Sequence, residues 1–439
     1  MKHRTMRLIG AIAVVVLLVS GCVAPAAPAA ESSTSAAASS EAAPAGEASG
    51  VVKVMSFLAA DTPEVEPSIV AAFQEANPGI TVEFEAVPFG DFFTKLKTLI
   101  AGGEAPDVVS LNIENLAAFA SLGALEDLGP YIERDGFDLG QYYESTLGMG
   151  QFDGKQYGLP ASFSTVALFY NKNMFDEAGI AYPDATWDWA KLQEEGAKLT
   201  IDKDNDGIID QFGTATAWWP VYLYANNADI FNADKTACAL TEPAAVEAIQ
   251  KYVNLSLVDK VAPTSSDLKT QSDWDMFMGG RLATFPVGPW ALAPFRGIEG
   301  FEWDVADMPA MARQATFLFG NPMAITADAA NKEAAWKYLQ FAAGEPGQRI
   351  RQAAGFEIAP VRAVAESEFV ASGAGLAPEH ISKFLDITSY AYLPPLHPQW
   401  QEIHDTIWPE LELALLGQQS VEDALSNACT GVDAILASN

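Results

Sequence analysis

An acidic loop in the middle of the chain carries oxygen ligands at the spacing that a calcium ion requires. Residues 202–210 place carboxylates at positions 1, 3, 5 and 9 of the run, with Gly207 at position 6. This reproduces the front of a calcium-binding loop, in which the glycine permits a sharp turn. The Glu expected at position 12 is replaced by Gly213. We predict a structural calcium ion, the alternative being an acidic turn without one. The candidate ligands are Asp202, Asp204, Asp206, Ile208 and Asp210.

The first 22 residues have the layout of a bacterial export signal. Basic residues precede an apolar run at residues 8–19, which is shorter than the roughly 20 residues needed to cross a bilayer. Val19-Ser20-Gly21-Cys22 resembles the lipobox, in which small residues before a cysteine allow a lipid to be attached to its thiol. We therefore expect a signal peptide at residues 1–21, lipidation of Cys22, and an anchor on the extracytoplasmic face of the membrane. An ordinary secretory peptide is the alternative.

Two cysteines remain in the body of the chain. Cys238 and Cys429 form an even pair in a chain with an export signal, which favours a disulfide between them. Two separate buried thiols are the alternative.

Composition separates a tether from an acidic body. Residues 22–50 are almost entirely Ala, Ser, Pro, Glu and Gly, which cannot bury enough apolar surface to fold, so we predict a disordered tether there. The net charge of −32 argues against a nucleic-acid partner, because phosphates would be repelled. With 439 residues, the chain is long enough for at least two lobes.

Hydrophobic periodicity predicts the elements that position these residues. After the tether, strand patterns at 51–57, 80–86 and 108–111 alternate with helical patterns beginning at Pro63 and Phe92. This β-α-β-α-β order is typical of an open α/β sheet. A strand at 166–170 and several helices follow, and the predicted helices lie at 187–199, 243–255, 331–343 and from about 400 onward.

Several separated segments resemble the family 1 extracellular solute-binding proteins, whose familiar member is maltose-binding protein. The resemblance covers essentially all of residues 51–439. The segments that carry it are Pro106-Asp107-Val108-Val109, Gly123-Ala124-Leu125-Glu126-Asp127-Leu128, Tyr157-Gly158-Leu159-Pro160, Leu168-Phe169-Tyr170-Asn171-Lys172, Phe175-Asp176-Glu177-Ala178-Gly179, Thr186-Trp187, Gly288-Pro289-Trp290 and Asn331-Lys332-Glu333-Ala334-Ala335-Trp336.

The resemblance implies a two-lobed α/β fold of the periplasmic-binding-protein type II, with discontinuous lobes joined by hinge crossings. We expect an N-terminal lobe at 51–162 and 322–366, and a C-terminal lobe at 163–321 and 367–439. It also implies a receptor for an ABC importer that closes on a sugar between its lobes and delivers it to permease subunits. The chain would act as a monomer and require no cofactor.

Sugars present apolar C–H faces ringed by hydroxyls, so their sites combine aromatic rings with planar polar groups. Trp218-Trp219-Pro220 resembles the family's aromatic segment, and Trp290 matches a residue that stacks on sugar. The resemblance suggests the same role for Trp400, while core packing is the alternative for each ring. The polar candidates lie near predicted lobe edges and are Asn112, Glu114, Ser164, Thr165 and Asn321, with solvated loops or backbone caps as the alternative. Ser164 replaces an acidic residue of maltose-binding protein, which argues against maltodextrin itself.

Two other classes of function stay open. A secreted glycan-active enzyme could use a pair of carboxylates, although 57 acidic residues make such pairs easy to find. The G-x-S-x-G, H-E-x-x-H and Walker motifs are absent from the sequence. A sensory or adhesive surface lipoprotein could also use this fold.

Overall fold

The computed structural model describes residues 48–58, 63–355 and 357–438. The predicted signal peptide, Cys22 and nearly all of the predicted tether lie outside these residues. Among the described residues, no helix combines the length and apolar character needed to cross a membrane.

The larger sheet combines parallel strands from the first part of the chain with antiparallel strands from later parts. Its order is β11-β10-β3-β1-β2, and β6 also pairs with β10. β1 runs parallel to β2 and β3, as the β-α-β-α-β pattern predicts, whereas β10 runs antiparallel to β3 and β6. The six strands are β1 (Gly50–Ser56), β2 (Ile80–Ala86), β3 (Val108–Ser110), β6 (Gly158–Thr165), β10 (Thr316–Ile325) and β11 (Ala391–Tyr392).

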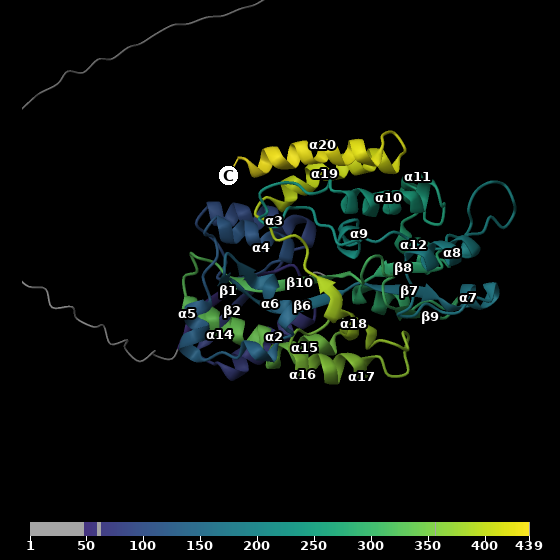
Figure 1. Cartoon of the computed structure of the whole chain (residues 1–439). Coiled ribbons are helices and arrows are strands. Elements are labelled where there is room, and N and C mark those ends of the chain that lie inside the picture. The colour runs from purple at the N-terminus through teal and green to yellow at the C-terminus, as the bar shows by residue number, and fades with distance from the viewer. Residues whose placement is uncertain (1–47, 59–62, 356, 439) are drawn as a thin grey trace, which may run out of the picture. The chain divides into compact units, whose positions relative to one another are not determined.

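Helices cover both faces of this sheet, because alternate side chains of its buried strands point to opposite sides. Val54 and Val108 share a core with α2 and α14, whereas Met55 and Val109 share another with α3 and α4. Figure 1 shows the two groups of helices on opposite sides of β1 and β10. The helices on this sheet are α2 (Val65–Ala76), α3 (Phe89–Ala101), α4 (Ile113–Ser121), α14 (Lys332–Ala343) and α15 (Glu345–Ala353).

A smaller antiparallel sheet, in the order β8-β7-β9, lies at the centre of the second lobe. Leu168 and Tyr170 of β7 belong to a core formed with several helices, while Phe169 points to the other face. There its ring lies 5.6 Å from that of Phe295 and 5.8 Å from that of Phe384. The elements are β7 (Ala167–Asn171), β8 (Thr284–Val287), β9 (Trp303–Ala306), α8 (Trp189–Leu199), α9 (Pro220–Ala225), α10 (Pro243–Leu257), α19 (Trp400–Leu415) and α20 (Val421–Leu436).

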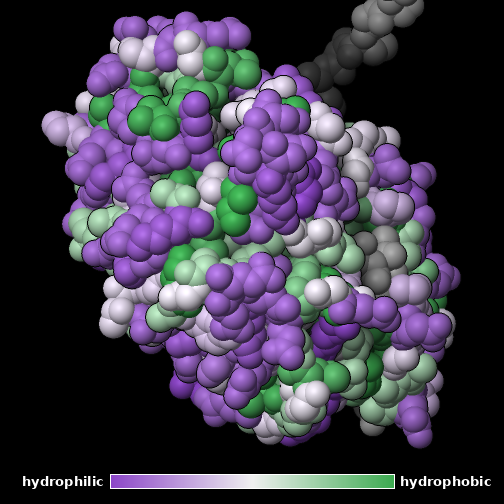
Figure 2. Space-filling model, turned by 90° about the vertical axis from the view of Figure 1, so that its right-hand side faces the viewer, coloured by the Kyte–Doolittle hydropathy of each residue, from purple (hydrophilic) through white to green (hydrophobic). Residues whose placement is uncertain are grey.

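Short elements complete the described part of the chain. They are α5 (Gly129–Asp135), α6 (Glu144–Leu147), α7 (Lys172–Ala178), α11 (Ser265–Thr270), α12 (Asp273–Met278), α13 (Leu292–Phe295), α16 (Arg362–Val364), α17 (Val370–Ser372), α18 (Lys383–Asp386), β4 (Gln151–Phe152) and β5 (Lys155–Gln156), with single turns η1 (Leu139–Gln141), η2 (Gly148–Gly150), η3 (Pro289–Ala291), η4 (Ala365–Phe369) and η5 (Ile387–Tyr390). The face in Figure 2 is mostly hydrophilic, and its hydrophobic residues lie in separate small patches.

Neighbouring strands connect the two sheets. Only Val166 separates β6 from β7. Strand β10 pairs with β11 at its beginning, with β3 at its end and with β6 along most of its length. The antiparallel β6–β10 ladder therefore leads from the larger sheet toward the smaller one. The predicted lobe boundaries at 162/163 and 321/322 fall inside β6 and β10, and the lobe ranges stay predictions.

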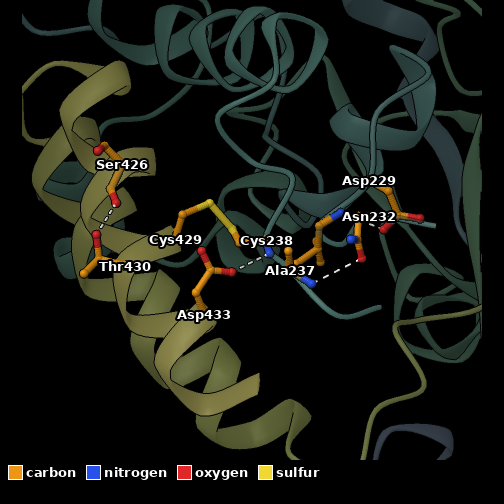
Figure 3. Close-up of a disulfide and its surroundings, with 9 residues drawn as sticks. Asp229, Asn232, Ala237, Cys238, Ser426, Cys429, Thr430 and Asp433 are labelled. Carbon is orange, nitrogen blue, oxygen red and sulfur yellow. Dashed lines mark hydrogen bonds between the residues drawn. A yellow bond between two sulfur atoms is a disulfide. The ribbon is translucent and has the colours of Figure 1, made fainter. Parts of the chain in front are cut away.

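A disulfide fastens the C-terminal helix to the segment that follows α9. Cys238 and Cys429 are bonded, with their Cα atoms 5.3 Å apart, as the even pair of cysteines predicts. Asp433, one turn further along α20, accepts a hydrogen bond of 2.7 Å from the backbone nitrogen of Cys238 (Figure 3). The disulfide and the Asp433 carboxylate therefore both attach Cys238 to α20.

Candidate ligand-binding site

Aromatic rings gather where β10 passes between the lobes. Alternate residues of a strand share one side, so Phe317, Phe319 and Asn321 point the same way. The Trp218 ring centroid lies 4.7 Å from that of Phe317 and 5.6 Å from that of Phe319. The Trp290 centroid lies 6.2 Å from that of Phe319, with the rings at 70°. Three segments far apart in sequence thus contribute to one aromatic group.

Helix α19 adds Trp400 to this group. Its ring centroid lies 6.2 Å from that of Trp218, with the planes at 81°. Trp218 and Trp290 are half-buried, and Trp400 is 4% exposed. Partly exposed rings can stack on the C–H face of a ligand. The structure therefore brings together three of the four predicted tryptophans.

Trp219 has a different position from its neighbour Trp218. It lies directly before α9, whose residues are all buried, and its side chain is 0% exposed within the core of the second lobe. A ring without exposed surface cannot stack on a solute, so the predicted ligand contact of Trp219 is corrected to a role in the core.

Gly288 determines how Trp290 is oriented. The indole folds back over the backbone of Gly288, where a Cβ atom would lie 2.0 Å from Cζ3 of the ring. An atom at that distance would displace the ring, so the Gly-Pro-Trp sequence has a direct steric reason for its glycine.

Two predicted polar residues lie at the start of α4, which follows the carboxyl end of β3. Ligands of open α/β sheets bind at such ends. Asn112 Nδ2 donates a hydrogen bond of 2.7 Å to Glu114 Oε2, and Asn112 Oδ1 accepts one of 2.8 Å from Asn115. Burial raises the pKa of Glu114 to about 6, although hydrogen bonds from its backbone and Asn112 oppose the shift. Helix α4 also packs against α19, the helix that begins with Trp400.

Asn321 and Ser164 lie on the same side of the β6–β10 ladder as the rings. Ser164 is opposite Phe319 and Ser162 is opposite Asn321, so their side chains share one face. Asn321 Nδ2 donates hydrogen bonds of 3.1 Å to Ser162 Oγ and 3.0 Å to Glu357 Oε2. Ser164 is 1% exposed, and its Oγ has no hydrogen-bond partner among the described residues. Such a hydroxyl gains most from a partner that a bound ligand or water supplies.

Thr165 belongs to the opposite face. It pairs with Leu318, and its hydroxyl donates a hydrogen bond of 2.7 Å to the carbonyl of Phe384. The residue is 0% exposed. Its predicted ligand contact is therefore corrected to a structural role between β6 and α18.

Other residues of the group were not predicted from the sequence. Phe317, Phe319, Ser162 and Glu357 lie beside the predicted residues. The alternation of Phe317, Phe319 and Asn321 is a strand pattern that could have identified this face.

A hollow of about 400 Å³ adjoins the aromatic group. Tyr224 on its wall lies 5.7 Å from Phe317 and stacks on Tyr392 at 5.2 Å, and Arg313 covers the Tyr392 ring at 4.8 Å. Asp229 also lines the hollow, and burial raises the pKa of its carboxyl. The lining thus combines aromatic faces with groups that can bind hydroxyls.

A larger hollow, of about 820 Å³, lies between β9 and residues 370–381. None of the predicted ligand residues lines it. Volume alone does not define a site, and the predicted aromatic residues Trp218, Trp290 and Trp400 gather beside the smaller hollow instead.

The predicted calcium loop keeps part of its expected geometry. Ligand atoms of Asp202, Asp204 and Asp210 lie within 4.8 Å of one another. Asp206 accepts a hydrogen bond from the backbone of Ile208, whose side chain is 65% exposed. Arg281 binds the backbone carbonyl of Asp210 at 3.0 Å, which fixes the end of the loop. Three of the four carboxylates therefore converge.

Comparison with known proteins finds binding proteins. A family model described as bacterial extracellular solute-binding protein matches residues 59–349. A putative binding protein of Brucella abortus is 30% identical over 83% of this chain and 88% of its own length. A maltotriose-binding protein of Pyrococcus abyssi is 26% identical over 68% of this chain and 63% of its own length.

Among solved structures, similar proteins share the two-lobed architecture. An ABC substrate-binding protein of Listeria monocytogenes, in complex with cycloalternan, has 32% identity and a TM-score of 0.79. The match covers 88% of this chain and 99% of that one.

Proposed function

Because this chain belongs to the bacterial extracellular solute-binding protein family, we propose that it captures a carbohydrate between its lobes for an ABC importer. The observation that carries the proposal is the convergence of Trp218 and Trp290 on Phe319 of β10, on the side of the β6–β10 ladder that also carries Ser164 and Asn321. Rings offer faces for sugar C–H groups, and a hydroxyl with an amide offers partners for hydroxyls. The cycloalternan-bound relative supports a carbohydrate ligand.

Capture would proceed by closure of the lobes. Trp218 and Trp400 belong to the core of the second lobe, whereas α4 packs on the larger sheet. A ligand that contacts both sides stabilises the closed arrangement by its greater affinity for that state. The β6–β10 ladder would serve as the hinge, and the closed monomer would then dock on permease subunits.

The proposed location is the extracytoplasmic face of the cell membrane. A lipid on Cys22 would hold the protein there, and residues 22–50 would let the body move above the surface. Support for this part comes from the sequence at residues 19–22 and the composition of the tether.

We also propose that the loop at 202–210 binds calcium in a structural role. Its support is the convergence of Asp202, Asp204 and Asp210, whose mutual repulsion an ion would offset. No cofactor is required for capture itself.

Thermal unfolding tests the proposed function directly. The mature chain is heated with a panel of mono- and oligosaccharides, polyols and amino acids, and a ligand at 100 times its Kd should add about 2.7 kcal/mol of stability. We expect a shift with a carbohydrate that Trp290→Ala abolishes. A panel without any shift would contradict capture, and release of shortened glycan products would indicate an enzyme instead.

A further inference from the structure

A buried histidine fastens the segment before α19 to the second lobe. His397 is 9% exposed, and its imidazole stacks on the ring of Phe231 with the centroids 5.5 Å apart. Its Nδ1 accepts a hydrogen bond of 3.2 Å from the backbone nitrogen of Gln399, which lies directly before α19. A ring nitrogen that accepts a hydrogen bond carries no proton, so this arrangement requires the neutral form of the imidazole.

The two sides of this contact are held differently. Residues 394–398 include three prolines, which have no N–H to donate, so backbone hydrogen bonds hold this segment only in part. On the other side, Phe231 forms a backbone bridge with Cys238, which the disulfide joins to α20. Loss of the contact at His397 should therefore displace the segment and leave Phe231 in place.

The segment is also part of the hollow beside the aromatic group. Residues 392–396 and Phe231 line this hollow of about 400 Å³. Immediately after the segment, the backbone nitrogen of Trp400 donates a hydrogen bond of 3.0 Å to the carbonyl of His397. The Trp400 ring contacts that of Trp218. His397 thus connects a wall of the hollow with the aromatic rings of the junction.

The charges around His397 oppose a proton on its ring. Burial lowers the pKa of His397, and the positive charge of Lys235 lowers it further. Lys235 Nζ donates a hydrogen bond of 3.4 Å to the carbonyl of Leu396, the residue before His397. Asp229 lines the same hollow as Lys235, and Glu402 in the first turn of α19 is exposed to solvent. The positive end of the α19 dipole also disfavours a cation at this place.

We propose that His397 is a positioning residue whose protonation weakens ligand capture in acid. An imidazolium carries a proton on both nitrogens, so it would lose the hydrogen bond from Gln399 and add a second positive charge near Lys235. The wall of the hollow is therefore fully stable above the ordinary pKa of 6.5 and loses stability as the pH falls below that value. This inference rests on the proposed carbohydrate function and adds a regulation of the same site.

Titration calorimetry at several pH values tests this proposal. The mature chain is titrated with the sugar of the unfolding panel that gives the largest thermal shift. We expect Kd to rise about three- to tenfold between about pH 7.5 and 5, as a difference of roughly half a unit to one unit in the pKa of a linked group implies. Glu114 and Asp229 are present in every variant below, so differences between the variants isolate the histidine.

His397→Asn removes the proton and retains the hydrogen bond. An asparagine oxygen can accept the N–H two residues further along the chain, but it does not titrate. This variant should bind the sugar as the unmodified protein does near neutral pH and should keep most of that affinity in acid. His380→Asn makes the same exchange at a side chain that is 61% exposed, and it should retain the full pH dependence. An equal rise of Kd in His397→Asn and the unmodified protein would overturn the proposal.

Nuclear magnetic resonance of the histidine rings provides a second test with the unmodified chain. Because the sugar favours the neutral form, its binding should lower the pKa of one ring by roughly half a unit to one unit. The signal of that ring should be missing from His397→Asn. Identical titration curves with and without the sugar would overturn the proposal while leaving carbohydrate capture intact. If no carbohydrate bound at neutral pH, the proposed function itself would be contradicted.

Discussion

The indole of Trp290 lies directly over Gly288, where a Cβ atom would come within 2.0 Å of the ring. Gly288→Ala should therefore displace the ring while leaving Trp290 itself in the chain. We expect a loss of ligand affinity that approaches that of Trp290→Ala, measured by calorimetry. Unchanged affinity in Gly288→Ala would show that the orientation of Trp290 is unimportant for binding.

Truncation of the two adjacent tryptophans should affect different properties of the protein. Trp219→Ala removes a fully buried ring and should lower the free energy of unfolding by about 3–5 kcal/mol. Trp218→Ala removes a half-buried ring and should reduce ligand affinity with a smaller loss of stability. Urea unfolding measures the stability of both variants, and calorimetry measures their ligand affinity. Similar losses of stability in the two variants would contradict the different positions of Trp218 and Trp219.

Glu114 should make stability depend on pH. Its pKa is raised from 4.5 to about 6 in the folded state, which therefore binds more protons than the unfolded state between these values. The contribution of Glu114 to the free energy of unfolding is greatest below about pH 4.5 and is lost as the pH rises through 6. In Glu114→Gln, the urea midpoint should change less across this range than in the unmodified protein. Identical pH profiles would rule out the raised pKa.

The disulfide should stabilise the second lobe. It closes a loop with a sequence separation of 191 residues, and replacing Cys238 and Cys429 by serine should lower the free energy of unfolding by about 2–5 kcal/mol. Chemical denaturation of the oxidised protein and the double variant provides the comparison. Adding a reducing agent should lower the stability of the oxidised protein and leave that of the double variant unchanged. Equal stability of the oxidised protein and the double variant would contradict the prediction.

Calcium should raise the melting temperature. The ion would offset the repulsion among the converging carboxylates of Asp202, Asp204 and Asp210, so Asp204→Asn should weaken the effect. Differential scanning calorimetry with calcium and with a chelator measures the shift. Asp328→Asn, outside the loop, is the matched control, and a shift that survives Asp204→Asn would place the ion elsewhere.

Periodicity predicted the first elements well. The pattern of Val65, Ile69 and Phe73 identified α2, and the alternating residues 80–86 identified β2, because local spacing alone determines which face is buried. The two-lobed α/β class, inferred from the family resemblance, is confirmed by the solved structures of similar proteins.

The faces of individual residues depended on partners distant in sequence. Ser164 and Thr165 are adjacent in β6, yet only Ser164 faces the rings. Which of the two does so depends on their pairing with β10, a strand about 150 residues later in the chain. Trp218 and Trp219 differ in the same way at the start of α9.

Equilibrium binding measures the central claim most directly. The mature chain and the double variant Trp218→Ala/Trp290→Ala are titrated with the carbohydrate that gives the largest thermal shift, and intrinsic tryptophan fluorescence is followed. We predict saturable one-to-one binding that the double variant loses while it stays folded by circular dichroism. Undiminished binding by the folded double variant would contradict a carbohydrate site at the junction of the lobes.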